Sequence, residues 1–463
     1  MTISTTRPSA ARDLTTAGLG TVLLGGALAP LDVSVVNIAL PSIGTELSAS
    51  AAALEWVVAG YGLAFALLLV VGGRLGDAIG RRRMFGLGMA AFTLASLACG
   101  LAPTVVGLVA ARAVQGGAAA MLVPQVLSII QAGTSGERRS RAIGYYGAGA
   151  GIAMVVGQLL GGVLVAGLGW RPIFLLNVPV GVVALVLAGR TIPETRASNP
   201  LGVDRLGTAL LGVALLALLV PLMEGRQAGW PAWCWALLGL SPVAAVAFVV
   251  VERRLEARGM VPLLPMSVLR VPSVWRGLSM LVPFFAGFGA FLFAFAITLQ
   301  QGLRLTALEA GMALAPLAAA FLVMSLVSAR LVARYGHRVI AVGACVQFVG
   351  LVLLIGTALA RWPELGVLAI APGMAICGAG QGVTAPTIFR VILSGVPAES
   401  AGAGSGVMTT TQQASFAVGV ATLGSLFVGL IAPLGMAGAL AVTVGVQGLL
   451  VLGIAVAALR LPR

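Results

Sequence analysis

The chain has 463 residues, of which 59% are hydrophobic and only 9% charged, whereas a soluble domain carries about a quarter charged residues. Most of its surface must therefore face lipid. Its 28 basic side chains are all arginine, so it lacks the lysine of a phosphate-binding loop or a Schiff-base site, and its four cysteines and one histidine have no metal-binding spacing.

Glycine, proline and charged residues divide the chain into about fourteen apolar segments, each near the roughly 20 residues that cross a bilayer as a helix. The sequence therefore predicts an all-α integral membrane protein with fourteen transmembrane helices. The predicted spans are 15–40, 54–73, 84–102, 105–130, 142–167, 172–189, 205–223, 231–251, 276–300, 308–329, 338–359, 365–389, 405–431 and 437–459.

The distribution of arginine supports this count and gives it a direction. If both termini lie in the cytoplasm, most of the arginines fall in cytoplasmic segments, as the positive-inside rule expects. The exceptions are Arg112, which lies inside a span, and the outer-loop residues Arg171, Arg226, Arg304 and Arg361. We expect a bacterial inner-membrane protein with several spans and two cytoplasmic ends.

An internal repeat predicts how the spans are grouped. Residues 73–82 read GRLGDAIGRR and residues 329–338 read ARLVARYGHR, an offset of 256 residues that corresponds to about eight spans. Two six-helix bundles separated by two extra spans would give that offset. The predicted parts are a cytoplasmic N-terminus (1–14), an N-terminal bundle (15–190), a linker with the two extra helices (191–275), a C-terminal bundle (276–459) and a cytoplasmic tail (460–463).

Five stretches carry a resemblance to a known family. They are APLDVSVVNIALP at 29–41, GRLGDAIGRRRM at 73–84, RAVQGGAAA at 112–120, GQLLGG with WRPIFLLNVPVG between 157 and 181, and the pair LQQGLRLTALEAGMALAPL and AGAGSGVMTTTQQASFAVGVA between 299 and 421. With the VDRLG stretch at 203–207, the chain resembles the fourteen-span drug:proton antiporters of the major facilitator superfamily, the group of the EmrB-like and QacA-like exporters.

The resemblance implies a major facilitator fold, proton-driven export, and roles for particular residues. It implies that Asp32 is the proton-coupling carboxylate and that the loop motif with Gly73, Asp77, Arg81 and Arg82 is a cytoplasmic gate. The family usually has Gly-Pro where this chain has Gly157 and Gln158. Gln158 keeps a backbone N–H that proline lacks, so the kink that proline gives is not required here.

Asp32 and Arg112 are the ionisable residues that lie well inside predicted spans. On insertion scales each charge costs about 2.5–3.5 kcal/mol at the centre of a membrane, so they need each other, a polar cavity or a function. We expect a switch in which Asp32 holds a proton when apart from Arg112 and releases it when paired. Gln115 follows Arg112 by three residues and could orient it. A purely structural ion pair is the alternative.

Other charged and aromatic residues have two readings each. Asp77, with Arg81 at i+4, is either the gate or a solvated cluster that sets topology. Glu55 is either an extra protonatable group or, as we expect, an interfacial carboxylate at a helix N-terminus. Phenylalanines at 284, 288, 291 and 295 form one helical stripe that either lines a drug cavity or, as we expect, packs. The polar residues predicted to line a cavity are Asn37, Tyr61, Gln115, Gln125, Gln158, Asn177, Gln301, Gln381, Gln412 and Gln413.

The sequence favours a proton-coupled exporter of small lipophilic, drug-like or antibiotic-like molecules. A uniporter or importer of another small molecule shares the fold and is the alternative. No nucleophile–base pair or soluble domain points to an enzyme, no cofactor is expected, and the expected partners are substrate, protons and lipid, without ATP or nucleic acid. Asp32 is predicted to be the only deeply embedded acid, which favours neutral or monocationic substrates.

Overall fold

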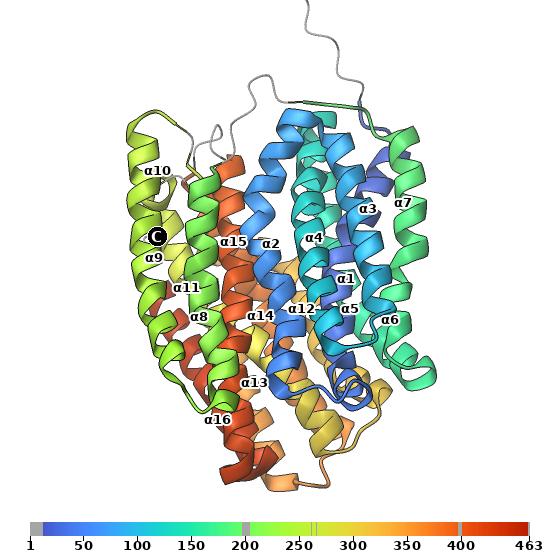
Figure 1. The fold of residues 1–463 in the computed structure, drawn as a ribbon, viewed down its shortest axis with the longest axis vertical. Coiled ribbons are helices and arrows are strands. Elements are labelled where there is room, and N and C mark those ends of the chain that lie inside the picture. The colour runs from blue at the N-terminus through green and yellow to red at the C-terminus, as the bar shows by residue number, and fades with distance from the viewer. Residues whose placement is uncertain (1–12, 197–203, 261, 265, 397–400, 462–463) are drawn as a thin grey trace, which may run out of the picture.

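The computed structural model describes residues 13–196, 204–260, 262–264, 266–396 and 401–461. Most of the predicted N-terminal segment, the end of the tail and Val203 of the VDRLG stretch lie outside the described residues. The described chain folds into helices joined by short connections (Figure 1). They are α1 (Thr16–Glu46), α2 (Ala51–Ile79), α3 (Arg81–Gly100), α4 (Val105–Gly133), α5 (Gly136–Leu168), α6 (Arg171–Leu175), α7 (Asn177–Thr191), α8 (Arg205–Ala228), α9 (Ala232–Ala257), α10 (Met266–Leu269), α11 (Pro272–Ile297), the π-helix η1 (Thr298–Gly302), α12 (Ala307–Tyr335), α13 (Arg338–Arg361), α14 (Val367–Ser394), α15 (Ala401–Gly419), the π-helix η3 (Val420–Gly424) and α16 (Ser425–Leu459).

Several helices start where the sequence supplies a cap. The side chains of Ser50, Thr104 and Thr306 accept a hydrogen bond from the first-turn backbone of α2, α4 and α12. Gly80 separates α2 from α3 with a φ of 116°, and Gly336 separates α12 from α13 with a φ of 64°. Both glycines lie within the repeated motif, so the repeat marks the same helix–turn–helix junction twice.

Twelve stretches within the described chain are long and apolar enough to cross a membrane. One of them, Gly406–Leu459, contains the non-helical residue Gly435, at which α16 bends into two pieces. Val156–Leu168 of α5 is a further apolar stretch, and by itself it is shorter than a span. The predicted number of fourteen depends on counting α5 and dividing 406–459 at Gly435, and it stays a prediction.

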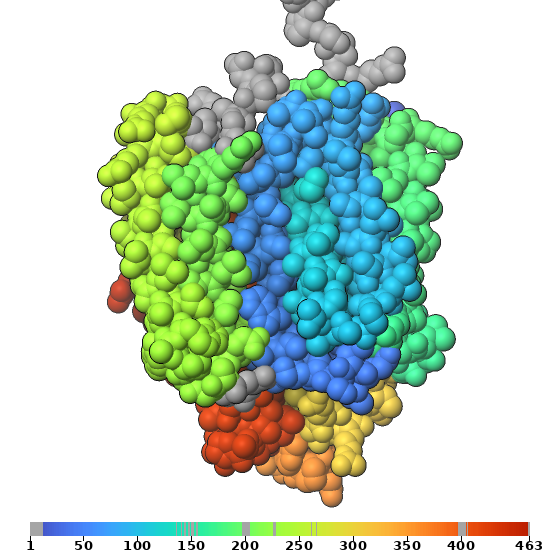
Figure 2. Space-filling model, in the orientation of Figure 1, coloured from blue at the N-terminus to red at the C-terminus, as the bar shows by residue number. Residues whose placement is uncertain are grey.

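The helices form two groups and a flanking pair. Helices α1 to α7 pack together, as do α11 to α16, and the two groups meet mainly where α2 contacts α15 and α5 contacts α12. The pair α8–α9 lies to one side and contacts α2 (Figure 1), and its side chains cover one flank of the molecule (Figure 2).

Glycines allow the closest helix pairs in both groups. A Cβ on Gly116 of α4 would lie 2.2 Å from the backbone oxygen of Tyr61 in α2. In the second group, a Cβ on Gly378 of α14 would lie 2.0 Å from the backbone oxygen of Leu317 in α12. The repeat therefore extends to packing, because both groups bring equivalent helices to backbone contact at a glycine.

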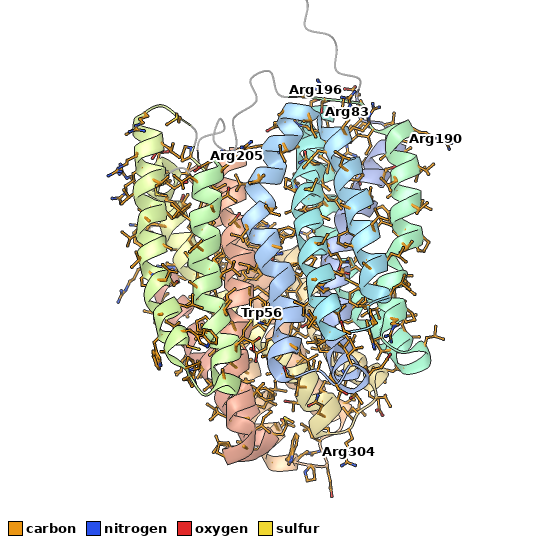
Figure 3. All side chains as sticks on the ribbon, viewed as in Figure 1. Trp56, Arg83, Arg190, Arg196, Arg205 and Arg304 are labelled. Carbon is orange, nitrogen blue, oxygen red and sulfur yellow. The ribbon has the colours of Figure 1, made fainter. Side chains whose placement is uncertain are left out.

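The two ends of the helices differ in charge. Arg83, Arg190, Arg196 and Arg205 lie at one end, which we call the arginine-rich end, and Arg304 lies at the opposite end (Figure 3). The loop motif between α2 and α3 lies at the arginine-rich end, because Arg83 belongs to it.

Candidate functional site

A buried ion pair joins α1 to α4 inside the first helix group. Nη1 of Arg112 lies 2.5 Å from Oδ2 of Asp32, and the two residues are only 1% and 2% exposed. Nε of Arg112 donates to the backbone oxygen of Val57 in α2 at 3.1 Å. The two charges that the sequence places in separate spans therefore neutralise each other, with α2 supplying a further acceptor.

Amide side chains complete the surroundings of the Asp32 carboxylate. Its Oδ1 accepts from Nε2 of Gln115 at 2.9 Å and from Nδ2 of Asn177 at 3.0 Å. Gln115 also accepts from Arg112 at 2.7 Å, so it contacts both members of the ion pair. Ser96 of α3 accepts from Gln115 and Asn177 and donates to the backbone oxygen of Phe174 in α6. The fixed donors stabilise the ionised form of Asp32.

Tyr61 covers the guanidinium group. The Arg112 Cζ atom lies 4.3 Å from the centre of the Tyr61 ring, and the Tyr61 hydroxyl has no hydrogen-bond partner among the described atoms. The site thus brings together five predicted residues, Asp32, Tyr61, Arg112, Gln115 and Asn177. Sequence reasoning missed Ser96, for which a small polar residue in an apolar span was the only signal.

The loop motif forms a second polar cluster at the arginine-rich end. Asp77 accepts from Nη2 of Arg81 at 2.9 Å, and the pair is partly exposed. The backbone N–H of Arg82 donates to Oε1 of Glu194 at 3.1 Å, and Glu194 follows the end of α7. A Cβ on Gly80 would lie 2.5 Å from the same oxygen. The motif is therefore anchored to the first helix group, and Glu194 was missed in the sequence.

Gly73 lies on α2 in the last turns before this loop. A Cβ added to it would lie 3.6 Å from Cβ of Pro124 in α4, an ordinary contact. Nearby, Nε2 of Gln125 donates to the backbone oxygen of Gly72 at 3.0 Å. Gln125 was predicted to line the substrate cavity, and the structure places it between α2 and α4, where Gly76 leaves room for its side chain.

A small cavity lies between the two helix groups. It is lined by Gln158 of α5, Gln381 of α14, and the apolar residues Phe288, Leu292, Leu314, Leu317, Ala318 and Phe321. Oε1 of Gln158 has no partner among the described atoms. Of the phenylalanine stripe, Phe288 lines this cavity, whereas Phe291 and Phe295 stack on each other with ring centres 5.1 Å apart. One phenylalanine of the stripe thus lines the cavity, and two others pack against each other.

Four other predicted cavity residues lie outside this lining, namely Asn37, Gln301, Gln412 and Gln413. Asn37 is buried and donates to the backbone oxygen of Val33 in its own helix at 2.7 Å. Gln412 is half-buried on α15. Gln301 is exposed in the π-helix η1, and its place in the substrate cavity stays a prediction. Its neighbour Gln300 instead donates to the backbone oxygen of Ile38 at 2.6 Å and joins the two helix groups.

Two acids besides Asp32 are enclosed by the fold. Glu55 and Glu252 are both fully buried. Oε2 of Glu55 accepts from the Ser425 hydroxyl at 2.7 Å, so Glu55 lies where α2 meets α16. The sequence placed both acids near span ends, and helices from other parts of the chain cover them.

A family comparison agrees with these two helix groups and the buried pair. The model of the Major Facilitator Superfamily matches residues 22–420. The chain belongs to the major facilitator superfamily. This facilitator is a multi-pass membrane protein of a family of transporters, and its match covers the ion pair, the loop motif and the central cavity.

Relatives of this facilitator cover most of its length. It is 37% identical over 421 residues to a probable actinorhodin transporter of Streptomyces coelicolor, covering 90% of this chain and 73% of the relative. It is 36% identical over 412 residues to a cephamycin export protein of Amycolatopsis lactamdurans, covering 86% and 82%. It is 37% identical over 419 residues to a puromycin resistance protein of Streptomyces alboniger, covering 89% and 82%.

The fold of this facilitator matches solved structures as well. A crystal structure of a peptide transporter POT in complex with sulfate aligns with a TM-score of 0.70 over 97% of each chain, at 16% identity. This low identity limits the likeness to the fold.

Proposed function

We propose that this facilitator is a proton-coupled exporter of small lipophilic or antibiotic-like molecules. The observation that carries the proposal is the buried Asp32–Arg112 pair, which lies inside the first helix group and apart from the residues that line the central cavity. Relatives whose names denote export of, or resistance to, antibiotics support the direction and the substrate class.

The position of the pair suggests how a proton and a substrate are exchanged. The Asp32 carboxylate accepts hydrogen bonds from Arg112 and two amides in the structure. A movement of α1 relative to α4 that separates Asp32 from Arg112 leaves a buried carboxylate with less compensation, and binding a proton removes that cost. Substrate in the cavity contacts α11, α12 and α14. The proton and the substrate therefore bind to different helices, and each affects the other through the relative position of these helices.

The lining of the cavity favours lipophilic molecules with few hydrogen-bonding groups. Phe288, Leu292, Leu314 and other apolar side chains form its walls, and Gln158 and Gln381 are the polar groups. Carboxamides can donate to or accept from a neutral ligand but cannot neutralise a strong charge. Neutral and monocationic compounds fit this lining better than anions or dications.

The remaining assignments complete the proposal. We propose that the chain lies in a bacterial inner membrane with the arginine-rich end in the cytoplasm, because cytoplasmic loops are enriched in arginine. The loop motif of Gly73, Asp77, Arg81 and Arg82 is the cytoplasmic gate. The six-helix groups, the added pair α8–α9 and the kink at Gly435 favour the fourteen-span antiporter group within the superfamily. No enzymatic step is part of this function.

The test is export from energised cells or proteoliposomes of a panel of lipophilic dyes and antibiotics. Wild type, Asp32→Asn and the control Glu137→Gln are compared with and without a protonophore. The Glu137 carboxylate is 81% exposed, so its neutralisation is expected to leave export intact. We expect export that both Asp32→Asn and the protonophore stop. Export that persists in both conditions would reject proton coupling and favour a uniporter.

A further inference from the structure

Two carboxylates meet at the arginine-rich end of the α8–α9 pair. Asp204 directly precedes α8, and its neighbour Arg205 lies at that end (Figure 3). Glu252 lies in the last turns of α9 and is fully buried. The point at which a Cβ on Gly207 would lie is 2.2 Å from Oδ2 of Asp204 and 2.2 Å from Oε1 of Glu252. The two oxygens therefore face each other across a space that only glycine leaves open.

Each carboxylate uses its other oxygen for the backbone. Oδ1 of Asp204 accepts from the N–H of Gly207 at 2.8 Å and caps α8. Oε2 of Glu252 accepts from the N–H of Leu264 at 2.7 Å. The two facing oxygens, Oδ2 and Oε1, have no donor among the described atoms. Two acceptors that face each other while buried repel unless a proton lies between them.

The charges around the pair match one bound proton. The charged groups that interact with Glu252 in the described chain are Asp204 and Arg74. Arg74 belongs to α2, is 9% exposed and donates to the backbone oxygen of Pro262. Two carboxylates with one proton carry a single negative charge, which the guanidinium of Arg74 balances. Without the proton the cluster has one uncompensated buried charge.

We infer that Asp204 and Glu252 share one proton and form a second proton-binding site, which joins the α8–α9 pair to α2 beside the loop motif. Binding the proton removes the repulsion between Asp204 and Glu252 and lets both lie beside Arg74 of α2, whereas losing it drives the two carboxylates apart. Arg74 precedes Asp77 by three residues, so the site acts on the same turn of α2 as the proposed gate. The protonation itself follows from the geometry, and only its effect on transport rests on the proposed function.

Infrared absorption of the purified protein in lipid tests the shared proton directly. A protonated carboxylic acid has a carbonyl band separate from that of a carboxylate. We expect Glu252→Gln and Asp204→Asn each to lose the intensity of about one such group per chain at neutral pH. Glu256→Gln is the matched control, because Glu256 lies one turn further on α9 and accepts from the N–H of Ser267 at 2.9 Å.

The outcomes separate this inference from the proposed function, because the spectrum needs no substrate and no gradient. A band that Glu256→Gln leaves intact and that both other variants remove supports the shared proton. A band that either Glu252→Gln or Asp204→Asn retains in full overturns it. If Glu252→Gln does not fold, Asp204→Asn still gives the result, since asparagine can cap α8. Gly207→Ala, which separates the two oxygens, is expected to remove the band as well.

Discussion

Neutralising either member of the Asp32–Arg112 pair should destabilise the protein unequally. Both residues are at least 98% buried, and removing one partner from such a pair costs about 3–5 kcal/mol because the other charge is left behind. In Arg112→Gln the remaining Asp32 can take up a proton and keeps two amide donors, Gln115 and Asn177. In Asp32→Asn the remaining arginine cannot lose its proton. We therefore expect Asp32→Asn to lie at the upper end of this range.

The double variant Asp32→Asn/Arg112→Gln removes both charges and should cost less than the sum of the two single changes. We expect an interaction free energy of about 0.5–3 kcal/mol from the double-mutant cycle. The assay is denaturant unfolding of the purified protein in mixed micelles, with the exposed Glu137→Gln as control. Additive costs would refute the reasoning, as would a larger cost for Arg112→Gln than for Asp32→Asn. Export should be absent in Asp32→Asn and in the double variant, since restored stability does not restore the proposed coupling carboxylate.

Three further predictions follow from contacts. Gly116→Ala should lower the yield of folded protein, because its Cβ meets backbone at 2.2 Å, whereas Gly86→Ala, which meets nothing within 4 Å, should be neutral in the same expression and gel-filtration assay. Gly80→Ala should destabilise by about 1–3 kcal/mol in a melting experiment, because φ is 116°, and an unchanged melting temperature would argue against strain there. Gln158→Ala and Gln381→Ala should each raise KM by about 2- to 10-fold for substrates that bear a hydrogen-bonding group, and should leave KM unchanged for purely apolar substrates. An equal effect on both kinds of substrate would show that these two side chains do not hydrogen-bond to the substrate.

The centre of the candidate site was predictable because its chemistry is local and rare. An acid and an arginine stand out in apolar spans, and Gln115 follows Arg112 by three residues, on the same face of α4. Ser96, the remaining partner, could not be predicted, because its contacts depend on where α3 passes α6 and α7. Neither hydropathy nor spacing contains that crossing point.

The end of the ninth predicted span shows a second limit of the sequence. Gln301 was predicted to line the cavity because of its place in the motif at 299–317. The chain turns into the π-helix η1 at Thr298, and the wider turn brings Gln300 against α1 and exposes Gln301. A π-helical turn is set by packing around it, so a periodicity of 3.6 residues gives no sign of it.

Glu55 and Glu252 show why burial inside the fold cannot be inferred from distance along a span. Glu55 and Glu252 both lie near the ends of predicted spans, where an acid normally reaches water. The first is covered at the contact with Ser425, whose hydroxyl also lies 3.1 Å from the backbone oxygen of Leu222 in α8, and the second is covered by Asp204 and the backbone of Leu264. Both are thus buried where α8 or α9 joins the rest of the fold. A pair of helices that only filled space beside α2 would need no acid where it contacts the rest of the fold. Burying an acid costs free energy unless a hydrogen-bond donor or a proton compensates. If the proposed proton coupling holds, the α8–α9 pair is therefore better understood as part of it than as an inert addition to the two helix groups.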